Sequence, residues 1–175
     1  APESRHAIFR FRLSHLVSSV FLDTFPKVMK LCWPGLTFDP HVQEKYVTLP
    51  NGSEIWFAGL DDKDRTEKIL GMEFATLYFN ECSQIPYNSI AMARTRLSQK
   101  VEQLIDGYAP GPLRLRAFYD ENPPSKNHWT YRTFIEKTDP ETRVALVRPD
   151  DYAVFFINPI DNMANLSSEY IGQLE

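Results

Sequence analysis

The chain has 175 residues, a length that suits one domain with its own hydrophobic core. Hydrophobic residues make up 43% of it, charged residues make up 24%, and the net charge is −4. This composition excludes a disordered tail, a collagen and a coiled coil, and the negative charge excludes a protein that holds nucleic acid by its overall charge. The apolar runs are short and interrupted by charged residues, so we expect no membrane span.

Glycine is scarce in this chain, with 7 glycines against 13 prolines. No arrangement of the glycines matches G-x-x-x-x-G-K-[ST] or G-x-G-x-x-G, the two common loops that bind phosphate groups. The sequence by itself therefore does not contain a complete nucleotide site of either kind.

The N-terminal part of the chain predicts a strand, a helix and a hairpin. His6–Leu13 alternates apolar and polar side chains, as a strand does, and Pro26 predicts a kink or two short helices within the helical stretch. Tyr46–Leu49 and Glu54–Leu60 flank Pro50-Asn51-Gly52, a strong turn signal, and predict a β-hairpin. The apolar residues that recur on one face of the helix are Val17, Phe21, Phe25, Val28 and Cys32.

The middle of the chain predicts two short elements and a longer helix. Arg65–Leu70 predicts one or two helical turns, and Thr76–Phe79 predicts an apolar strand that ends at Asn80-Glu81. Asn88 is expected to cap an amphipathic helix. The apolar residues of that helix are Ile90, Ala93, Leu97, Val101 and Leu104.

The C-terminal part predicts two further strands. Leu113–Tyr119 is expected to form a strand that ends at Asp120-Glu121-Asn122, and a helix over about 128–137 follows it. Tyr152–Ile157 predicts a last strand, which ends at Asn158. A short helix over 167–174, capped by Ser167, is expected to close the chain.

Strands separated by helices indicate parallel crossovers, so we expect an α/β fold with a mainly parallel sheet flanked by helices, as a single domain over residues 1–175. The polar clusters at Asn80-Glu81, Asp120-Glu121-Asn122 and Asn158 follow three of the strands. In an open α/β sheet the ligand site lies at the carboxyl ends of the strands. The chemistry is therefore expected at that edge.

The segment Ala75–Glu81, with the sequence ATLYFNE, is the strongest local signal for chemistry. A hydrophobic strand with an amide and a carboxylate at its tip suits the handling of water and a metal ion beside a phosphate. The carboxylate can orient or deprotonate an attacking water, and Asn80 can hold a water of a Mg²⁺ shell. Taken alone, the same pattern also fits a core strand with a polar end.

Several motifs occur in a characteristic order over nearly the whole chain. They are a strand and helix at Arg5–Phe21, a G-S-x-I-x-F-x-G hairpin at Gly52–Gly59, the acidic Leu60-Asp61-Asp62, the segments Glu67–Gly71 and Phe79–Ile85, Asn122-Pro123-Pro124 with His128-Trp129, and Asn158–Asn162 through Tyr170-Ile171. Together they resemble the ATPase domain of phage terminase large subunits, the motors that package DNA into procapsids. In this resemblance Phe79–Ile85 is similar to the end of the Walker B strand.

The resemblance implies a P-loop NTPase core that is truncated at its N-terminus and lacks both the P-loop (Walker A) and the nuclease domain. It implies an ATPase that uses ATP and Mg²⁺ to drive DNA translocation. The implied partners are double-stranded DNA, a portal protein and a small terminase subunit, in a homo-oligomeric ring in the host cytoplasm. We expect the chain alone to be inactive and to bind ATP poorly, because the phosphate-binding loop is missing.

Two residues of the Walker B end carry the implied catalytic role. Glu81 would be the carboxylate that activates water for attack on the γ-phosphate. Asn80 stands where the family usually has Asp, and an amide can hold a metal-bound water but brings no negative charge. The resemblance therefore implies that Asn80 holds Mg²⁺ weakly and through water.

The resemblance also implies coupling residues and an arginine that acts on a neighbouring subunit's nucleotide. Asp120, Glu121 and Asn122 would line the tip of the next strand and sense the hydrolysis state, with Asn122 as the first choice. Arg65 lies where the family supplies the trans-acting arginine, which stabilises charge in the transition state. Alternatively, Arg65 is only a charged side chain exposed on a helix. Lys68, Arg94 and Arg96 are the other candidates for the trans-acting residue.

The stretch from Arg94 to Arg132 carries a local excess of positive charge, which arises from seven basic and four acidic residues. Arg94, Arg96 and Lys100 could face DNA, because phosphate contacts give affinity without reading sequence. A solvated helix face explains the same charges. A thiol nucleophile at Cys82 with His128 as its base is disfavoured, because Cys82 directly follows a carboxylate.

A second function class remains open beside the motor. The same α/β sheet, without a P-loop, would also suit an interaction or regulatory module that binds a partner. An upstream G-x-x-x-x-G-K-[ST] in the parent gene favours the motor, and a natural start codon at Ala1 favours the module.

Overall fold

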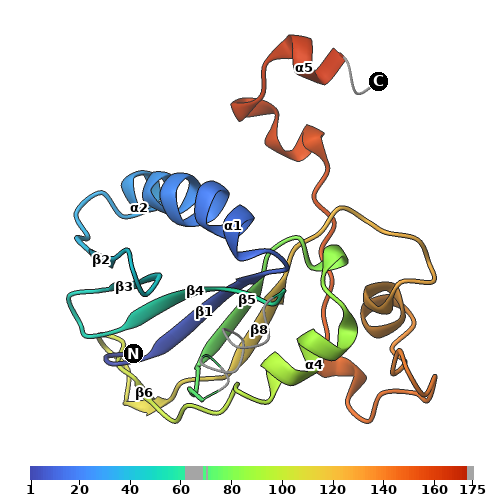
Figure 1. The fold of residues 1–175 in the computed structure, drawn as a ribbon, viewed down its shortest axis with the longest axis horizontal. Helices are drawn as coiled ribbons and strands as arrows, with labels where there is room; N and C mark the ends of the chain where they lie inside the picture. Colours follow the sequence, from blue (N-terminus) through green and yellow to red (C-terminus); the bar gives the residue numbers. More distant parts are fainter. Residues whose placement is uncertain (62–68, 70, 173–175) are drawn as a thin grey trace. The chain divides into compact units, whose positions relative to one another are not determined.

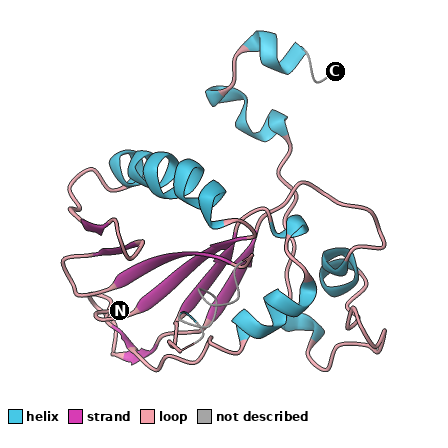
Figure 2. Ribbon diagram, in the orientation of Figure 1, coloured by secondary structure: helices cyan, strands magenta, loops and turns pink. Residues whose placement is uncertain are grey.

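A mixed, mainly parallel sheet organises the N-terminal part of the chain (Figures 1 and 2). In the computed structural model the strand order is β2-β3-β4-β1-β5-β8. Neighbours among β4, β1, β5 and β8 pair in parallel, whereas β2, β3 and β4 pair antiparallel. The strands are β1 (Arg5–Arg10), β2 (Asp39–His41), β3 (Tyr46–Thr48), β4 (Glu54–Gly59), β5 (Thr76–Phe79) and β8 (Arg116–Tyr119).

The structure describes residues 1–61, 69 and 71–172, and the chain divides into two units, Ala1–Pro123 and Pro124–Glu175. The sheet belongs to the first unit, and helices flank it there. This confirms the predicted α/β class with a mainly parallel sheet. Most of the predicted turn at Arg65–Leu70 lies outside the described residues. None of the helices in the described part of the chain is long and apolar enough to cross a bilayer.

One continuous helical run covers one side of the sheet. It comprises α1 (Leu13–Leu16), the π-helical segment η1 (Val17–Thr24) and α2 (Phe25–Cys32). Pro26 is the second residue of α2, so its missing N–H falls where the hydrogen-bonding register changes. Of the two predicted alternatives, a kink or two short helices, the separation into two helices does not occur, because η1 continues directly into α2. The core on this side contains Leu16, Phe21, Val47 and Phe57.

Helix α4 (Tyr87–Arg94) lies along the other side of the sheet (Figure 1) and buries Ile90 and Ala93. The prediction that this helix extends to Leu104 is wrong. Beyond Arg94 the backbone bonds to Phe74 instead: Phe74 N–H donates to Arg96 O at 2.8 Å, and Ser98 N–H donates to Phe74 O at 3.1 Å. Strands β6 (Glu102–Gln103) and β7 (Gly111–Pro112) then form a small hairpin. Pro86, rather than the predicted Asn88, precedes the first turn of α4.

The second unit is built mainly from short helical segments. The predicted strand over Tyr152–Ile157 is wrong, because the backbone there has no strand partner within the described residues, and Phe155 and Ile157 are exposed. Ser167 caps α5 as predicted, since its hydroxyl accepts the Tyr170 N–H at 3.2 Å. The helical segments are η3 (Tyr131–Ile135), η4 (Pro149–Asp151), η5 (Pro159–Asn165) and α5 (Ser168–Gly172).

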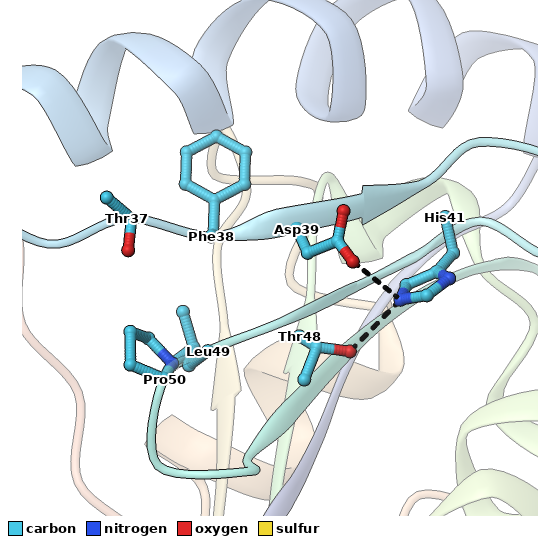
Figure 3. Close-up of a pocket in the computed structure, with 7 residues that line it drawn as sticks. All are labelled: Thr37, Phe38, Asp39, His41, Thr48, Leu49 and Pro50. Carbon is cyan, nitrogen blue, oxygen red and sulfur yellow. Dashed lines mark hydrogen bonds and ion pairs between the residues drawn. The ribbon is translucent and has the colours of Figure 1, made fainter.

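The predicted hairpin is present as β3 and β4, with Tyr46 opposite Trp56. The rings of His41, Tyr46 and Trp56 stack on one another, with centroids 4.1 and 4.4 Å apart. His41 also contacts Thr48 and Asp39 in an open pocket at this edge of the sheet (Figure 3). These contacts fix β2 against the hairpin.

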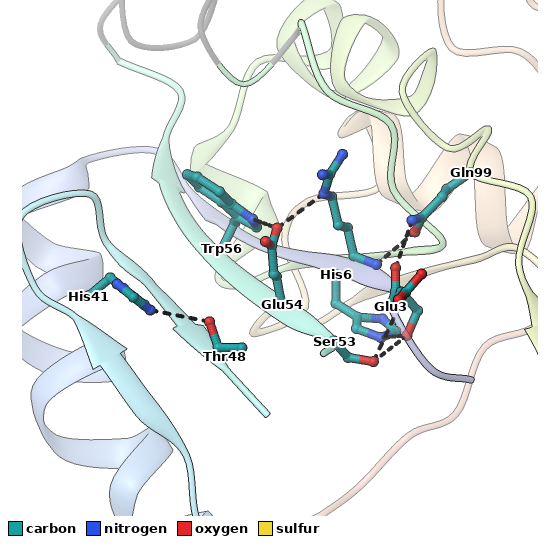
Figure 4. Close-up of polar contacts among 10 residues, drawn as sticks. Glu3, His6, His41, Thr48, Ser53, Glu54, Trp56 and Gln99 are labelled. Atoms are coloured by element: carbon teal, nitrogen blue, oxygen red, sulfur yellow. Dashed lines mark hydrogen bonds and ion pairs between the residues drawn. The ribbon is translucent and has the colours of Figure 1, made fainter. Parts of the chain in front are cut away.

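Polar side chains connect the amino ends of β1 and β4 (Figure 4). The Ser4 hydroxyl lies 3.0 Å from the Ser53 hydroxyl and 2.9 Å from His6 Nε2, and both serines are buried. Glu54 accepts hydrogen bonds from Arg5 Nε at 3.0 Å and from the Trp56 indole at 2.9 Å. Burial lowers the pKa of His6 from 6.5.

Gly59 ends β4 where the chain passes close to α1. A Cβ at this position would lie 2.5 Å from the backbone nitrogen of Leu13 and 2.7 Å from its Cβ. We expect Gly59→Ala to lower the free energy of unfolding by about 1–3 kcal/mol, because the backbone must move. Urea unfolding measures this, with Gly35→Ala as the matched control because nothing lies within 4 Å of its added carbon. Equal midpoints for the two variants would contradict the close approach.

The lowered pKa of His6 predicts a pH dependence of stability. The unfolded chain binds a proton at His6 more readily than the folded chain does. The free energy of unfolding is therefore highest above pH 6.5 and decreases as the pH falls below it. His6→Gln should flatten this decline in a series of thermal unfolding curves, and the exposed His15 supplies the control substitution His15→Gln. An equally steep decline in His6→Gln would show that His6 does not cause this pH dependence.

Candidate functional site

The carboxyl ends of β5 and β8 bring three of the predicted site residues together. The two strands pair in parallel with Phe79 beside Tyr119, so Asn80 and Asp120 follow at the same edge. Asn80 Nδ2 donates to the two Asp120 carboxylate oxygens at 2.9 and 3.2 Å. Glu81 joins them, because its backbone N–H donates to Asp120 Oδ1 at 2.6 Å.

Glu81 leaves the strand in a left-handed backbone conformation, with φ 49° and ψ 50°. This conformation costs a non-glycine residue about 1–3 kcal/mol and persists where surrounding contacts hold it. The bond to Asp120 is one such contact, and the 3₁₀ turn η2 (Cys82–Gln84) that follows supplies another through the Gln84 N–H, which donates to Glu81 O. The left-handed turn changes the direction of the chain at the end of β5 and leaves the Glu81 side chain 41% exposed.

Arg10 is a site residue that the sequence analysis missed. It ends β1, the strand beside β5, and its Nη2 forms an ion pair with Glu81 Oε2. Gln84 Nε2 donates to the same oxygen at 2.9 Å. Arg10 Nη1 also donates to Ser19 Oγ in η1 at 2.7 Å, and the Arg10 side chain is only 12% exposed. The parallel register of β1 with β5 places the C-terminal residue of β1 beside the tip of β5, and no local pattern in the sequence indicates this register.

The surroundings keep the neighbouring phenol and thiol protonated. Burial and the nearby Asp120 carboxylate raise the pKa of Tyr78, whose hydroxyl donates to Asp120 Oδ2 at 2.9 Å. Burial and the Glu121 carboxylate raise the pKa of Cys82, whose Sγ lies 3.3 Å from Glu121 Oε2. A protonated, buried thiol is a poor nucleophile, so this geometry disfavours Cys82 catalysis, as the sequence indicated.

The donor set at this edge fits a metal ion that keeps most of its water. Because the Asn80 amide nitrogen faces Asp120, its Oδ1 is the atom left to accept a hydrogen bond from metal-bound water. Within the described residues, no group of three or more His, Cys, Asp or Glu side chains could hold a metal directly. Mg²⁺ is commonly bound through water and substrate phosphates rather than by a full protein cage, so the residues present suit it.

The other predicted site residues lie elsewhere or outside the described residues. Asn122 follows β8 and is exposed, and no hydrogen bond joins it to Asn80 or Glu81 in the described part of the chain. Arg65 falls outside the described residues. Of the predicted DNA-binding residues, Arg94 ends α4, and Arg96 and Lys100 follow it. This segment lies near the amino end of β5, where Arg96 O accepts the Phe74 N–H. With about 3.3 Å per residue, that end is roughly 20 Å from Asn80.

Solved structures share this fold. The large terminase from a thermophilic bacteriophage matches 99% of the chain with a TM-score of 0.73 at 17% identity, and its complex with ADP matches 99% with a TM-score of 0.68 at 18% identity. The ATPase domain of the Thermus phage P74-26 large terminase matches 87% of the chain with a TM-score of 0.53 at 16% identity, and the match covers 63% of that domain. The chain spans 37% of the length of the thermophilic phage's terminase in each of its two structures.

Sequence comparison supplies the family. No curated protein matches the chain. The family model described as "Phage terminase large subunit" matches residues 35–175, which is most of the chain and includes Asn80, Glu81 and Asp120. This chain therefore belongs to the phage terminase large subunit family.

Proposed function

We propose that this chain forms the central part of the ATPase motor of a DNA-packaging terminase and supplies its catalytic carboxylate, Glu81. The observation that carries the proposal is the strand-tip arrangement, in which Asn80 and Glu81 at the end of β5 are held by Asp120 at the end of β8. Family membership and the fold shared with a terminase solved with ADP support the same function. In this proposal β5 is the Walker B strand.

Glu81 would act on the water that attacks the γ-phosphate of ATP. Within the described residues, two interactions hold its carboxylate, from Arg10 and from Gln84, and both go to Oε2. Since no described residue contacts Oε1, this oxygen would accept a proton or hydrogen bond from water. Arg10 and Gln84 thereby orient the carboxylate so that Oε1 faces the water, and the left-handed backbone at Glu81 determines where the side chain leaves the chain.

Asn80 would hold Mg²⁺ through water by its Oδ1, and the bound ion would neutralise charge on the phosphate groups. Asn122, next to Asp120, is proposed as the residue that senses hydrolysis, and Arg65 as the arginine that reaches a neighbouring subunit's nucleotide. Arg94, Arg96 and Lys100 are proposed to contact the DNA backbone from the opposite end of the sheet.

The whole protein would translocate double-stranded DNA into a procapsid as a homo-oligomeric ring in the host cytoplasm, together with a portal protein and a small terminase subunit. The second candidate is an interaction module that uses the same sheet without nucleotide. The sequence given contains no glycine loop that binds phosphates, so such a module would use the sheet only to contact a partner. The two candidates differ in whether Glu81 is required for ATP hydrolysis by a full-length protein that contains this chain.

We expect Glu81→Gln in such a full-length large subunit to lower the rate of ATP hydrolysis by about 10²–10⁴-fold, because glutamine cannot take a proton from water. Equilibrium binding of ATP should change little. Phosphate release and fluorescent-nucleotide binding measure the two quantities, and the exposed Glu44 supplies the control variant Glu44→Gln. Hydrolysis at the normal rate in Glu81→Gln would show that β5 is not the Walker B strand and would favour the interaction module.

We expect the 175-residue chain by itself to bind ATP only in the millimolar range or not at all. Glu81, Asn80 and Asp120 offer one side of a nucleotide site, and the loop amides and lysine that surround phosphates in P-loop proteins are absent from the sequence. Isothermal titration with ATP and Mg²⁺ measures this. A micromolar dissociation constant would mean that the chain holds a nucleotide site of a different construction.

A further inference from the structure

We propose that Asp120 is the positioning residue of this site: its carboxylate supplies, from β8, the negative charge that Asn80 lacks on β5, and it holds both Asn80 and Glu81 in their working orientations. This role rests on the proposed function of Glu81. It differs from sensing of the hydrolysis state, because Asp120 would act through Asn80 and Glu81 rather than by contact with nucleotide.

The first support is the number of groups that converge on one carboxylate. Oδ2 accepts from Tyr78 Oη and from Asn80 Nδ2, each at 2.9 Å, and Oδ1 accepts the Glu81 N–H at 2.6 Å. The backbone of Asp120 adds two more contacts: its N–H donates to Phe79 O at 3.1 Å, and its carbonyl accepts the Cys82 N–H at 2.9 Å. Asp120 thus bonds to each of the five residues from Tyr78 to Cys82.

The second support is the chemistry of the three side-chain bonds. A phenol, an amide NH₂ and a backbone N–H are all donors, and an ionised carboxylate is an acceptor with room for all of them. The raised pKa of Tyr78 agrees with a phenol that stays protonated and keeps donating. An asparagine at position 120 would present an NH₂ group of its own to these donors, and one or more of the bonds would be lost.

The third support is the backbone of Glu81. Its left-handed conformation is the place where the chain turns from β5 into η2, and the N–H of that same residue carries the 2.6 Å bond to Asp120. Together with the bond from the Gln84 N–H to Glu81 O, the charged acceptor at the end of the neighbouring strand holds this turn. Without it Glu81 would be free to relax toward ordinary backbone angles, and its carboxylate would move relative to Arg10.

An exchange of the amide and the carboxylate tests this directly. The variants are Asp120→Asn, Asn80→Asp and the double variant that carries both changes. Asp120→Asn sets two NH₂ groups against each other, and Asn80→Asp sets two carboxylates against each other. The double variant restores one donor and one acceptor across the same gap.

In the 175-residue chain, hydrogen exchange at the Glu81 amide is followed by NMR. We expect each single variant to speed exchange at this amide at least tenfold and the double variant to recover most of the protection, which is a strong coupling in the double-mutant cycle. Asp106→Asn, at an exposed loop position, is the control. Unchanged exchange in Asp120→Asn, or a double variant in which the two effects merely add, overturns the proposal.

The kinetic counterpart uses a full-length large subunit that contains this chain. We expect Asp120→Asn to lower kcat for ATP by roughly 10–100-fold, the range typical of residues that orient catalytic or metal-binding groups, with a smaller change in KM. The double variant should regain much of kcat. A full kcat in Asp120→Asn, despite faster exchange at Glu81, would reduce Asp120 to a purely structural role and overturn the proposal. The exchange experiment does not depend on hydrolysis, so a failure of the Glu81 assignment would be seen separately, as normal hydrolysis in Glu81→Gln.

Discussion

Parallel pairing of β5 with β8 is the constraint on which the candidate site depends. Because Phe79 lies beside Tyr119, the first residues beyond the two strands lie side by side, although they are 40 positions apart in the chain. The parallel register of β1 with β5 adds Arg10 to the same edge. A shift of one residue in either register would turn Asp120 or Arg10 away from Glu81, since successive side chains of a strand point to opposite faces. The site is therefore as well defined as the sheet.

The side chains of Asn80 and Asp120 are joined by hydrogen bonds across the ends of β5 and β8. In the proposed assignment of β5 as the Walker B strand, an amide at position 80 removes a negative charge, and a carboxylate one strand away lies 2.9 Å from the amide nitrogen. The Asp120 carboxylate keeps one negative charge at the ends of the two strands. It also binds the Asn80 amide nitrogen, so that Asn80 Oδ1 faces away from Asp120. The same carboxylate engages the N–H of Glu81, so the charge and the backbone turn at this site depend on one side chain.

The two ends of β5 carry different chemistry. Carboxylates and amides lie at its carboxyl end, and the basic residues proposed to contact DNA lie at and beyond the end of α4, near the amino end of β5. Helix α4 begins at Tyr87, a few residues beyond Glu81, and ends at Arg94. Strand β5 and helix α4 thus both run between the two ends. The ion pair of Arg10 with Glu81, together with the bond from Arg10 to Ser19, gives the long helix on the other side of the sheet its own connection to Glu81.

The sequence by itself determined the α/β class, the β3–β4 hairpin, strand β5 and the polar residues at its tip, because alternation, turn residues and apolar runs are local signals. The sequence predicted the wrong structure for 95–104, where the apolar residues have helical spacing but the backbone forms hydrogen bonds with Phe74. It was also wrong over Tyr152–Ile157, where an apolar run forms no strand within the described residues. Only the tertiary structure identified Arg10 and gave Asp120 its contacts to Tyr78, Asn80 and Glu81. The physical reason is that strand order and register set distances between residues far apart in the chain, and neither is written in the local pattern of either strand.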